Sequence, residues 1–368
     1  MARPHPPPMH RRRFLASAAS ASLAGALVPR LAAAGPGAAG GGRRDDGLVF
    51  DAMGELRPEY PESVLRAMLG SGLDAITITL CDPKPEGEAA LALAVDELLA
   101  HDRFLASRPD VFLKALGIAD VDRARAAGKL AVFYMYQNTT QFGTSPDRVG
   151  MFHAMGMRAC QLTYNTRNHA GVGCWEAGGI TEFGRGLIAR LNAARVLIDL
   201  SHANMTTMAE TVAASSAPVI VSHTACMAVH ANRRNTTDEN LRAVAARGGV
   251  IGICQMRPFL TTRRSGALPA YFDHLRHAID VAGVEHVAIG SDRDYRVVEL
   301  SPEYLAELKR EEGSQVVDAD LPYFIDELNG PGRMTVVRDG LRRLGLSAAD
   351  VDKVMGGNLY RLYREVIG

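Results

Sequence analysis

Two histidines stand at the ends of two consecutive apolar runs. His202 follows the run 196–200, and His223 follows the run 219–222. Imidazole is the commonest protein ligand for a catalytic divalent metal such as zinc. The alternative is a pair of hydrogen-bonded structural histidines, but their equivalent positions after neighbouring runs favour a shared ligand. The pair is therefore predicted to bind a divalent metal ion, with Zn²⁺ expected and other divalent metals left open.

Two charged residues follow similar runs. Asp292 comes two residues after the end of the run 287–290, where a carboxylate could accept a proton from metal-bound water. The alternative is an Asx-type turn or a helix N-cap, a role for which Asp294 is better placed. Arg234 follows His223 by a short segment and could bind a substrate carboxylate through two parallel hydrogen bonds. A surface arginine is the alternative there.

The elements that position these residues alternate between short β-forming runs and amphipathic stretches. Eight strands are expected, at residues 48–51, 75–80, 130–136, 159–163, 196–200, 219–222, 250–254 and 287–290. Helices are expected at 61–69, 183–194, 205–214 and 238–246, the last with Thr237 as its N-cap. This pattern predicts an α/β fold, a single (β/α)₈ TIM-type barrel over residues 47–368. The carboxyl ends of barrel strands share one rim, so the four groups are expected to face one another.

The first 46 residues are predicted to lie outside the barrel. Three arginines at 11–13 precede an Ala-rich stretch that ends in Ala32, Ala33 and Ala34. This order is typical of a twin-arginine export signal at 1–34, followed by a flexible linker at 35–46. A disordered basic tail is the alternative. The signal predicts an exported, periplasmic protein with no stable membrane span after cleavage.

The overall composition narrows the class of partner. The 41 basic and 41 acidic residues cancel, which argues against nucleic acid and favours a small neutral or zwitterionic molecule. A homodimer is left open. The five cysteines are scattered without a CxxC pattern, so at least one must stay unpaired. Cys174, in a Gly-rich loop, is the most notable of them.

Several motifs from residue 48 to the C-terminus together resemble the renal dipeptidase (peptidase M19) family. They lie at residues 199–202, 217–224, 232–235, 240–242, 248–250, 286–292 and 356–358. The resemblance implies a metal-dependent hydrolase barrel that cleaves dipeptides with a zinc-bound hydroxide held between two metal ions. It places His202 and His223 on two ligands of the second metal, Arg234 on the substrate-binding arginine and Asp292 on the catalytic aspartate.

The first half of the chain departs from the pattern of that family. Met53 and Glu55 stand where the family has a histidine and an aspartate, Gln137 where it has a metal-bridging glutamate, and Tyr164 where it has a substrate-binding histidine. A thioether is a poor zinc ligand, and a neutral amide cannot bridge two dications. One zinc ion is therefore expected rather than two, with Gln137 and Glu55 as weaker ligands. Tyr164 is expected to contact the substrate and donate a hydrogen bond to a developing oxyanion.

Three functions are compatible with this combination of groups. The first is a metal-dependent hydrolase that cleaves a dipeptide or a related small amide. The alternative is a catalytically weak or inactive barrel that binds a peptide or a small carboxylate. Hydrolysis of a different amide or of a cyclic substrate is a third interpretation.

Overall fold

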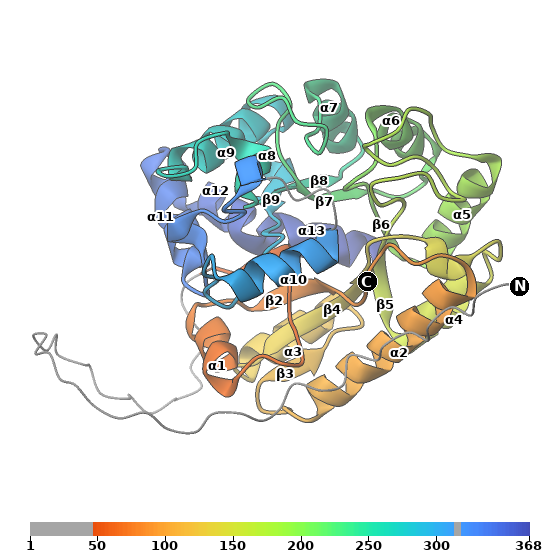
Figure 1. Ribbon diagram of the computed structural model, residues 1–368, viewed down its shortest axis with the longest axis horizontal. Helices are drawn as coiled ribbons and strands as arrows, with labels where there is room; N and C mark the ends of the chain where they lie inside the picture. The colour runs from red at the N-terminus through yellow and green to blue at the C-terminus, as the bar shows by residue number, and fades with distance from the viewer. Residues whose placement is uncertain (1–46, 313–317) are drawn as a thin grey trace, which may run out of the picture. The chain divides into compact units, whose positions relative to one another are not determined.

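The computed structural model describes residues 47–312 and 318–368 (Figure 1). The predicted signal peptide (1–34) and linker (35–46) lie outside the described residues. Within the described part of the chain, no helix combines the length and the apolar character needed to cross a membrane.

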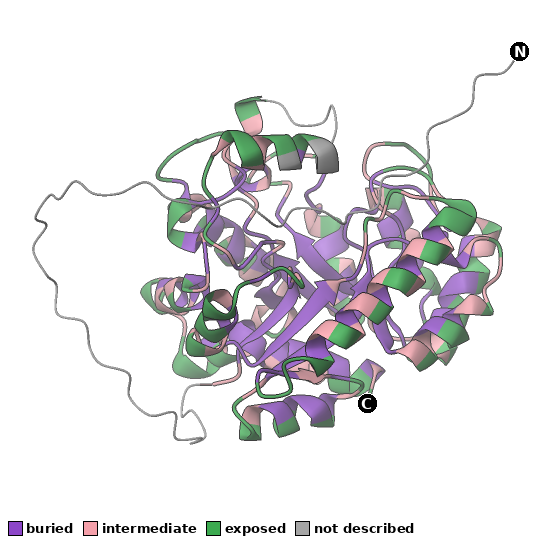
Figure 2. Ribbon diagram, turned by 60° about the horizontal axis from the view of Figure 1, so that its bottom comes forward, coloured by how far each residue is buried: buried purple, intermediate pink, exposed green. Residues whose placement is uncertain are grey.

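Eight parallel strands form the predicted TIM-type barrel. In their order around the barrel they are β1 (Phe50–Gly54), β2 (Ala75–Thr79), β4 (Leu130–Tyr136), β5 (Met157–Gln161), β6 (Leu197–Asp199), β7 (Ile220–Thr224), β8 (Val250–Ile253) and β9 (Val287–Ile289). All eight overlap the predicted runs, which confirms the expected fold. The strands are almost entirely buried because helices cover their outer face, which explains their continuous apolar character (Figure 2).

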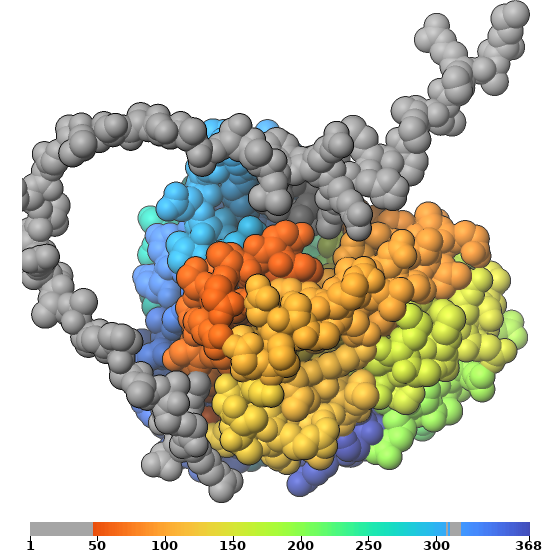
Figure 3. All heavy atoms as spheres, turned by 90° about the horizontal axis from the view of Figure 1, so that it is seen from below, coloured from red at the N-terminus to blue at the C-terminus, as the bar shows by residue number. Residues whose placement is uncertain are grey.

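The first and last strands meet through backbone hydrogen bonds at and just beyond their carboxyl ends. The amide of Glu55 donates to the carbonyl of Arg293 at 3.1 Å, and the amide of Asp292 donates to the carbonyl of Met53 at 2.9 Å. In the surface view, the first described residues, in red and orange, accordingly lie beside the blue C-terminal part (Figure 3). This closure brings Asp292 next to the end of β1.

A ninth strand was not predicted. β3 (Phe112–Lys114) pairs only with the start of β4 and lies off the path of the barrel. Leu113 and Lys114 are only partly buried, so β3 lacks the continuous apolar run that marks the barrel strands.

The helices pack around the strands with their exposed faces outward (Figure 2). They are α1 (Glu62–Gly70), α2 (Gly87–Ala106), α3 (Ile118–Ala126), α4 (Arg148–Met155), α5 (Glu182–Ala193), α6 (Met205–Ala214), α7 (Asp238–Ala246), α8 (Arg257–Leu260), α9 (Leu268–Ala282), α10 (Pro302–Glu312), α11 (Arg333–Arg343), α12 (Ala348–Asp352) and α13 (Asn358–Val366). The four predicted helices are confirmed. Thr237 caps α7 as predicted, since its hydroxyl accepts a hydrogen bond from the amide of Asn240.

Aromatic packing closes the amino-terminal end of the barrel. Tyr363 of α13 lies with its ring centroid 4.9 Å from those of both Phe50 and Phe133, in edge-on contacts. Its hydroxyl is 2.5 Å from the hydroxyl of Thr77 on β2. Among the described residues this end is filled by side chains, so the carboxyl ends of the strands are the expected rim for a ligand.

Candidate active site

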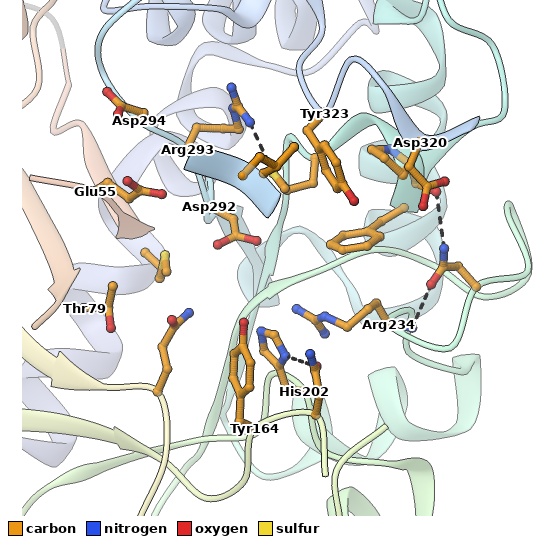
Figure 4. Close-up of a pocket in the computed structure, with 18 of the residues that line it drawn as sticks. Glu55, Thr79, Tyr164, His202, Arg234, Asp292, Arg293, Asp294, Asp320 and Tyr323 are labelled. Atoms are coloured by element: carbon orange, nitrogen blue, oxygen red, sulfur yellow. Dashed lines mark hydrogen bonds between the residues drawn. The ribbon is translucent and has the colours of Figure 1, made fainter. Parts of the chain in front are cut away.

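A cavity of about 820 Å³ opens at the carboxyl ends of the strands. Figure 4 shows the side chains around it. The predicted site residues on its wall are Glu55, Gln137, Tyr164, His202, Arg234 and Asp292. His223 is completely buried directly behind His202. The tertiary structure thus brings together residues that are up to 237 positions apart in the chain, between Glu55 and Asp292.

The two histidines approach each other through their Nε2 atoms, which lie 3.0 Å apart. His202 Nδ1 is 2.6 Å from Asn165 Oδ1, an oxygen that can only accept, so this Nδ1 carries a hydrogen. His223 Nδ1 is 2.7 Å from Ser222 Oγ, whose own hydrogen is donated to Asp199 Oδ2 at 2.6 Å. Both Nε2 atoms therefore present lone pairs to each other.

Neither imidazole carries a second proton to relieve this contact. Burial and the neighbouring Arg234 hold the pKa of His202 and the pKa of His223 well below the ordinary value. Two neutral imidazoles with converging lone pairs fit a divalent cation. Two nitrogens bound to one tetrahedral zinc ion at about 2.0–2.1 Å would lie roughly 3.3 Å apart, close to the arrangement here.

A buried carboxylate holds the second histidine in place. Asp199 ends β6 and accepts hydrogen bonds from the hydroxyls of Ser201 and Ser222 and from both of their backbone amides. Burial raises the pKa of Asp199, while these hydrogen bonds act in the opposite direction. The hydroxyl of Ser201 also accepts the amide hydrogen of His223 at 3.0 Å. Such an outer layer fixes the tautomer and the orientation of a ligating imidazole.

Gln137 and Glu55 are bound to other groups. The amide nitrogen of Gln137 lies 3.4 Å from His223 Nε2 and donates to the same lone pair, so the amide would have to turn to offer its oxygen. Glu55 lines the cavity but pairs with Arg57, at 2.7 Å from Nε and 2.5 Å from the terminal nitrogen. In the described residues no group of three His, Cys, Asp or Glu side chains is arranged to hold a metal ion.

Tyr164 packs directly on His202. Its ring is stacked on that of His202, with centroids 4.2 Å apart and planes inclined by 25°. Its hydroxyl points into the cavity on the side of Asp292 (Figure 4). The tyrosine can therefore both orient His202 and donate a hydrogen bond to a bound molecule.

Arg234 is buried on the cavity wall, with only 7% of its surface exposed. One terminal nitrogen donates to the carbonyl of His223 at 3.4 Å, and the guanidinium lies 5.2 Å from the ring centroid of Phe259. Its Nε has no hydrogen-bond partner in the described structure. A buried guanidinium with unused donors fits a carboxylate.

Asp292 occupies a strained backbone position at the end of β9. Its φ angle is 53°, in the left-handed region that residues other than glycine seldom adopt, and His202 has a φ angle of 66°. The turn that follows is built instead by Asp294, whose carboxylate accepts the amide hydrogen of Arg296 at 2.7 Å. The predicted turn role of Asp294 is thereby confirmed.

Several residues of this site were not predicted. Asn165 and Ser222 fix the two histidines, and Arg293 and Trp175 line the cavity. The one available signal was Asp199, a charged residue within an apolar strand. Cys174 is half-buried and donates to Asn165 Oδ1 at 3.5 Å, and all five cysteines are free thiols, so none is consumed by a disulfide.

Comparison with solved structures shows the same barrel in an amidohydrolase and in a metallo peptidase. An amidohydrolase from Pseudomonas aeruginosa superposes with a TM-score of 0.79 and 25% identity over 88% of this chain and 97% of its own. A metallo peptidase from Rhodobacter sphaeroides, solved with a phosphinate mimic of the dipeptide L-Ala-D-Ala, superposes with a TM-score of 0.75 at 19% identity, over 88% of this chain and all of its own. This second likeness shows the fold.

Sequence comparison identifies the family. Dipeptidase verJ of Clonostachys rogersoniana is 32% identical over 46% of this chain, and dipeptidase ataJ of Aspergillus terreus is 27% identical over 72%. These matches span 44% and 64% of the two relatives. The sequence pattern of the membrane dipeptidases (peptidase family M19) matches residues 65–310. The chain therefore belongs to the membrane dipeptidase family.

Proposed function

We propose that this protein is a metal-dependent hydrolase of dipeptides or related small amides, with one zinc ion bound by His202 and His223. The observation that carries the proposal is the 3.0 Å approach of two Nε2 lone pairs on a cavity that also holds Arg234 and Asp292. The dipeptidase names of the relatives and the dipeptide mimic in the Rhodobacter structure support the same substrate class.

Each side chain has a proposed task. A zinc ion on the histidine pair would activate a water molecule as the nucleophile. Arg234 binds the terminal carboxylate of the substrate, and Asp292 accepts a proton from the attacking water and returns it to the leaving amine. Tyr164 donates a hydrogen bond to the oxygen that becomes negative in the transition state.

A single ion is proposed because the end of β1 offers weak ligands. Met53 supplies a thioether, and Glu55 is held by Arg57. Gln137 supplies an amide oxygen only after its amide turns. Gln137 and Glu55 are therefore proposed as weaker ligands that complete the coordination with water.

The test combines metal analysis with turnover. The mature protein is expected to bind about one zinc ion per chain and to hydrolyse members of a dipeptide panel, with both properties lost in His223→Ala. His153→Ala is a matched control, since that histidine lies on α4 outside the cavity. Absence of both stoichiometric metal and metal-dependent turnover would contradict the proposal.

The alternative is a binding protein that keeps the cavity without hydrolysis. It is favoured by the lack of a third acidic, thiol or imidazole ligand among the described residues. It predicts dipeptide binding without turnover at any metal concentration, measured by calorimetry beside the activity assay.

We further propose that residues 1–34 export the protein to the periplasm. The support is the order of arginines, apolar stretch and small residues. Replacing Arg12 and Arg13 by lysine should retain the protein in the cytoplasm, as measured by cell fractionation. Unchanged export would contradict this role.

A further inference from the structure

A second buried arginine lines the cavity wall, and the proposed mechanism does not use it. Arg293 follows Asp292 directly and is only 5% exposed. One of its terminal nitrogens contacts the sulfur of Met256 at 3.4 Å, and its guanidinium lies 5.9 Å from the ring centroid of Phe324. A thioether and an aromatic face are weak partners for a guanidinium.

Arg293 forms no ion pair within 4.0 Å with an acidic side chain of the described structure. Its Nε is buried without a hydrogen-bond partner, as is that of Arg234, and neither arginine forms an ion pair with a described residue. Asp294, the residue that follows Arg293 in the chain, forms ion pairs with other arginines. Its carboxylate lies 2.5 Å from Arg296 and 3.6 Å from Arg57. A buried charge without a partner is costly, so a site that keeps one is built for an anionic ligand.

Figure 4 draws Arg234 and Arg293 on different sides of the proposed catalytic carboxylate, Asp292. If Arg234 holds the terminal carboxylate and Asp292 serves the scissile amide, Arg293 faces the residue on the N-terminal side of that amide. This step rests on the proposed function.

We propose that Arg293 selects substrates that carry a second carboxylate on the N-terminal side of the scissile amide, such as dipeptides that begin with glutamate or aspartate. The guanidinium would form a charge-assisted hydrogen bond with that side chain, while its aromatic and thioether neighbours exclude water. A neutral side chain of equal size would leave the buried charge unpaired.

The experiment compares isosteric substrates. kcat/KM is measured for Glu-Ala and Gln-Ala. It is also measured for Ala-Glu and Ala-Gln, which carry the same side chains on the C-terminal side of the scissile amide. The wild-type protein should prefer Glu-Ala over Gln-Ala by at least about tenfold. Arg293→Gln should reduce that ratio to near one, chiefly by lowering kcat/KM for Glu-Ala. Arg293→Lys should retain part of the preference for Glu-Ala, and it shows whether a positive charge alone is sufficient for this preference.

Arg233→Gln is the matched control. Arg233 lines the same cavity, and its replacement by glutamine removes the same charge, but its side chain is exposed to solvent. The ratio of kcat/KM for Glu-Ala to that for Gln-Ala should therefore change by less than about twofold. Thermal unfolding of each variant shows that the change in the ratio is not a loss of folded protein. A wild-type ratio near one, a ratio unaffected by Arg293→Gln, or a preference confined to Ala-Glu would overturn the proposal.

Calorimetry separates this inference from the proposed function. The affinities of Glu-Ala and Gln-Ala are measured in Asp292→Asn, which should bind without turnover. A preference for Glu-Ala in binding, together with no turnover by the wild type, would sustain the role of Arg293 and contradict the hydrolase. Turnover of all four peptides without preference would support the hydrolase and contradict the role of Arg293. If neither Glu-Ala nor Gln-Ala binds, the role of Arg293 is also overturned.

Discussion

The Nε2 atoms of His202 and His223 lie 3.0 Å apart, and each ring is fixed from behind through its Nδ1 atom. The partners are unlike, an amide oxygen of Asn165 for one ring and the hydroxyl of Ser222 for the other. In both cases the Nδ1 hydrogen is used, so the lone pairs converge. The orientation of the proposed metal ligands is thus set by two residues, Asn165 and Ser222, that are not themselves proposed as ligands.

Replacing Ser222 by alanine should therefore weaken the proposed zinc site without removing a ligand. The substitution cuts the link between Asp199 and His223, and loss of such an outer partner lowers metal affinity by about 10- to 100-fold. Competition with a chromophoric chelator measures this change. Ser71→Ala, at the end of α1, is the control and should leave the affinity unchanged. Equal zinc affinities of Ser222→Ala and Ser71→Ala would show that the hydrogen bonds from Asp199 through Ser222 to His223 are not needed.

Arg234→Lys should raise KM for a dipeptide by about tenfold or more, because lysine cannot form the paired hydrogen bonds of a guanidinium. A dipeptide amidated at its C-terminus lacks the carboxylate and should show little difference between wild type and variant. The comparison of the two substrates is the measurement. An equal loss on both would mean that Arg234 supports the fold rather than the carboxylate.

Gly290→Ala should destabilise the protein by about 1–3 kcal/mol, the usual cost of overpacking. A Cβ atom at this position would overlap the carbonyl oxygen of Ser222, directly before His223. Urea unfolding measures the stability, and zinc affinity should fall as well because the strand that carries His223 must shift. Gly186→Ala on α5 is the control, since its Cβ would meet no atom within 4 Å. A fully stable Gly290→Ala protein would contradict this close packing.

His274 predicts a specific dependence of stability on pH. Its Nδ1 accepts the amide hydrogen of Cys226 at 2.9 Å while Nε2 donates to the carbonyl of Leu260, so the folded state needs the neutral ring. Burial lowers its pKa to about 4. Between pH 6.5, the approximate pKa of His274 in the unfolded chain, and pH 4, the unfolded chain binds a proton at His274 that the folded protein does not. The free energy of unfolding therefore falls as the pH falls through this window. The contribution lost by pH 4 is at most about 3 kcal/mol.

The matching measurement is the free energy of unfolding of wild type and His274→Gln from pH 4 to pH 7. Glutamine cannot titrate, so the difference between the two proteins should be largest at pH 7 and shrink as the pH falls through this window. A difference that stays constant with pH would contradict the assignment.

The sequence by itself determined the class of fold and the rim on which the chemistry lies. Eight apolar runs predicted the eight barrel strands because burial on both faces leaves a continuous local signal, and Thr237 marked the start of α7 because capping is local as well. His202 and Asp292 could be placed on one rim because all strand ends of a parallel barrel point the same way. The short strand β3 gave no such signal.

Only the tertiary structure decided how those groups are held and which of them are engaged. Glu55 is paired with Arg57, the amide of Gln137 turns its nitrogen to His223, and Arg293 is buried without an acidic partner in the described structure. These facts depend on contacts between loops that follow different strands, and on a closure that joins β1 to β9. Periodicity reports local conformation and burial, so it carries no information on which distant side chains meet.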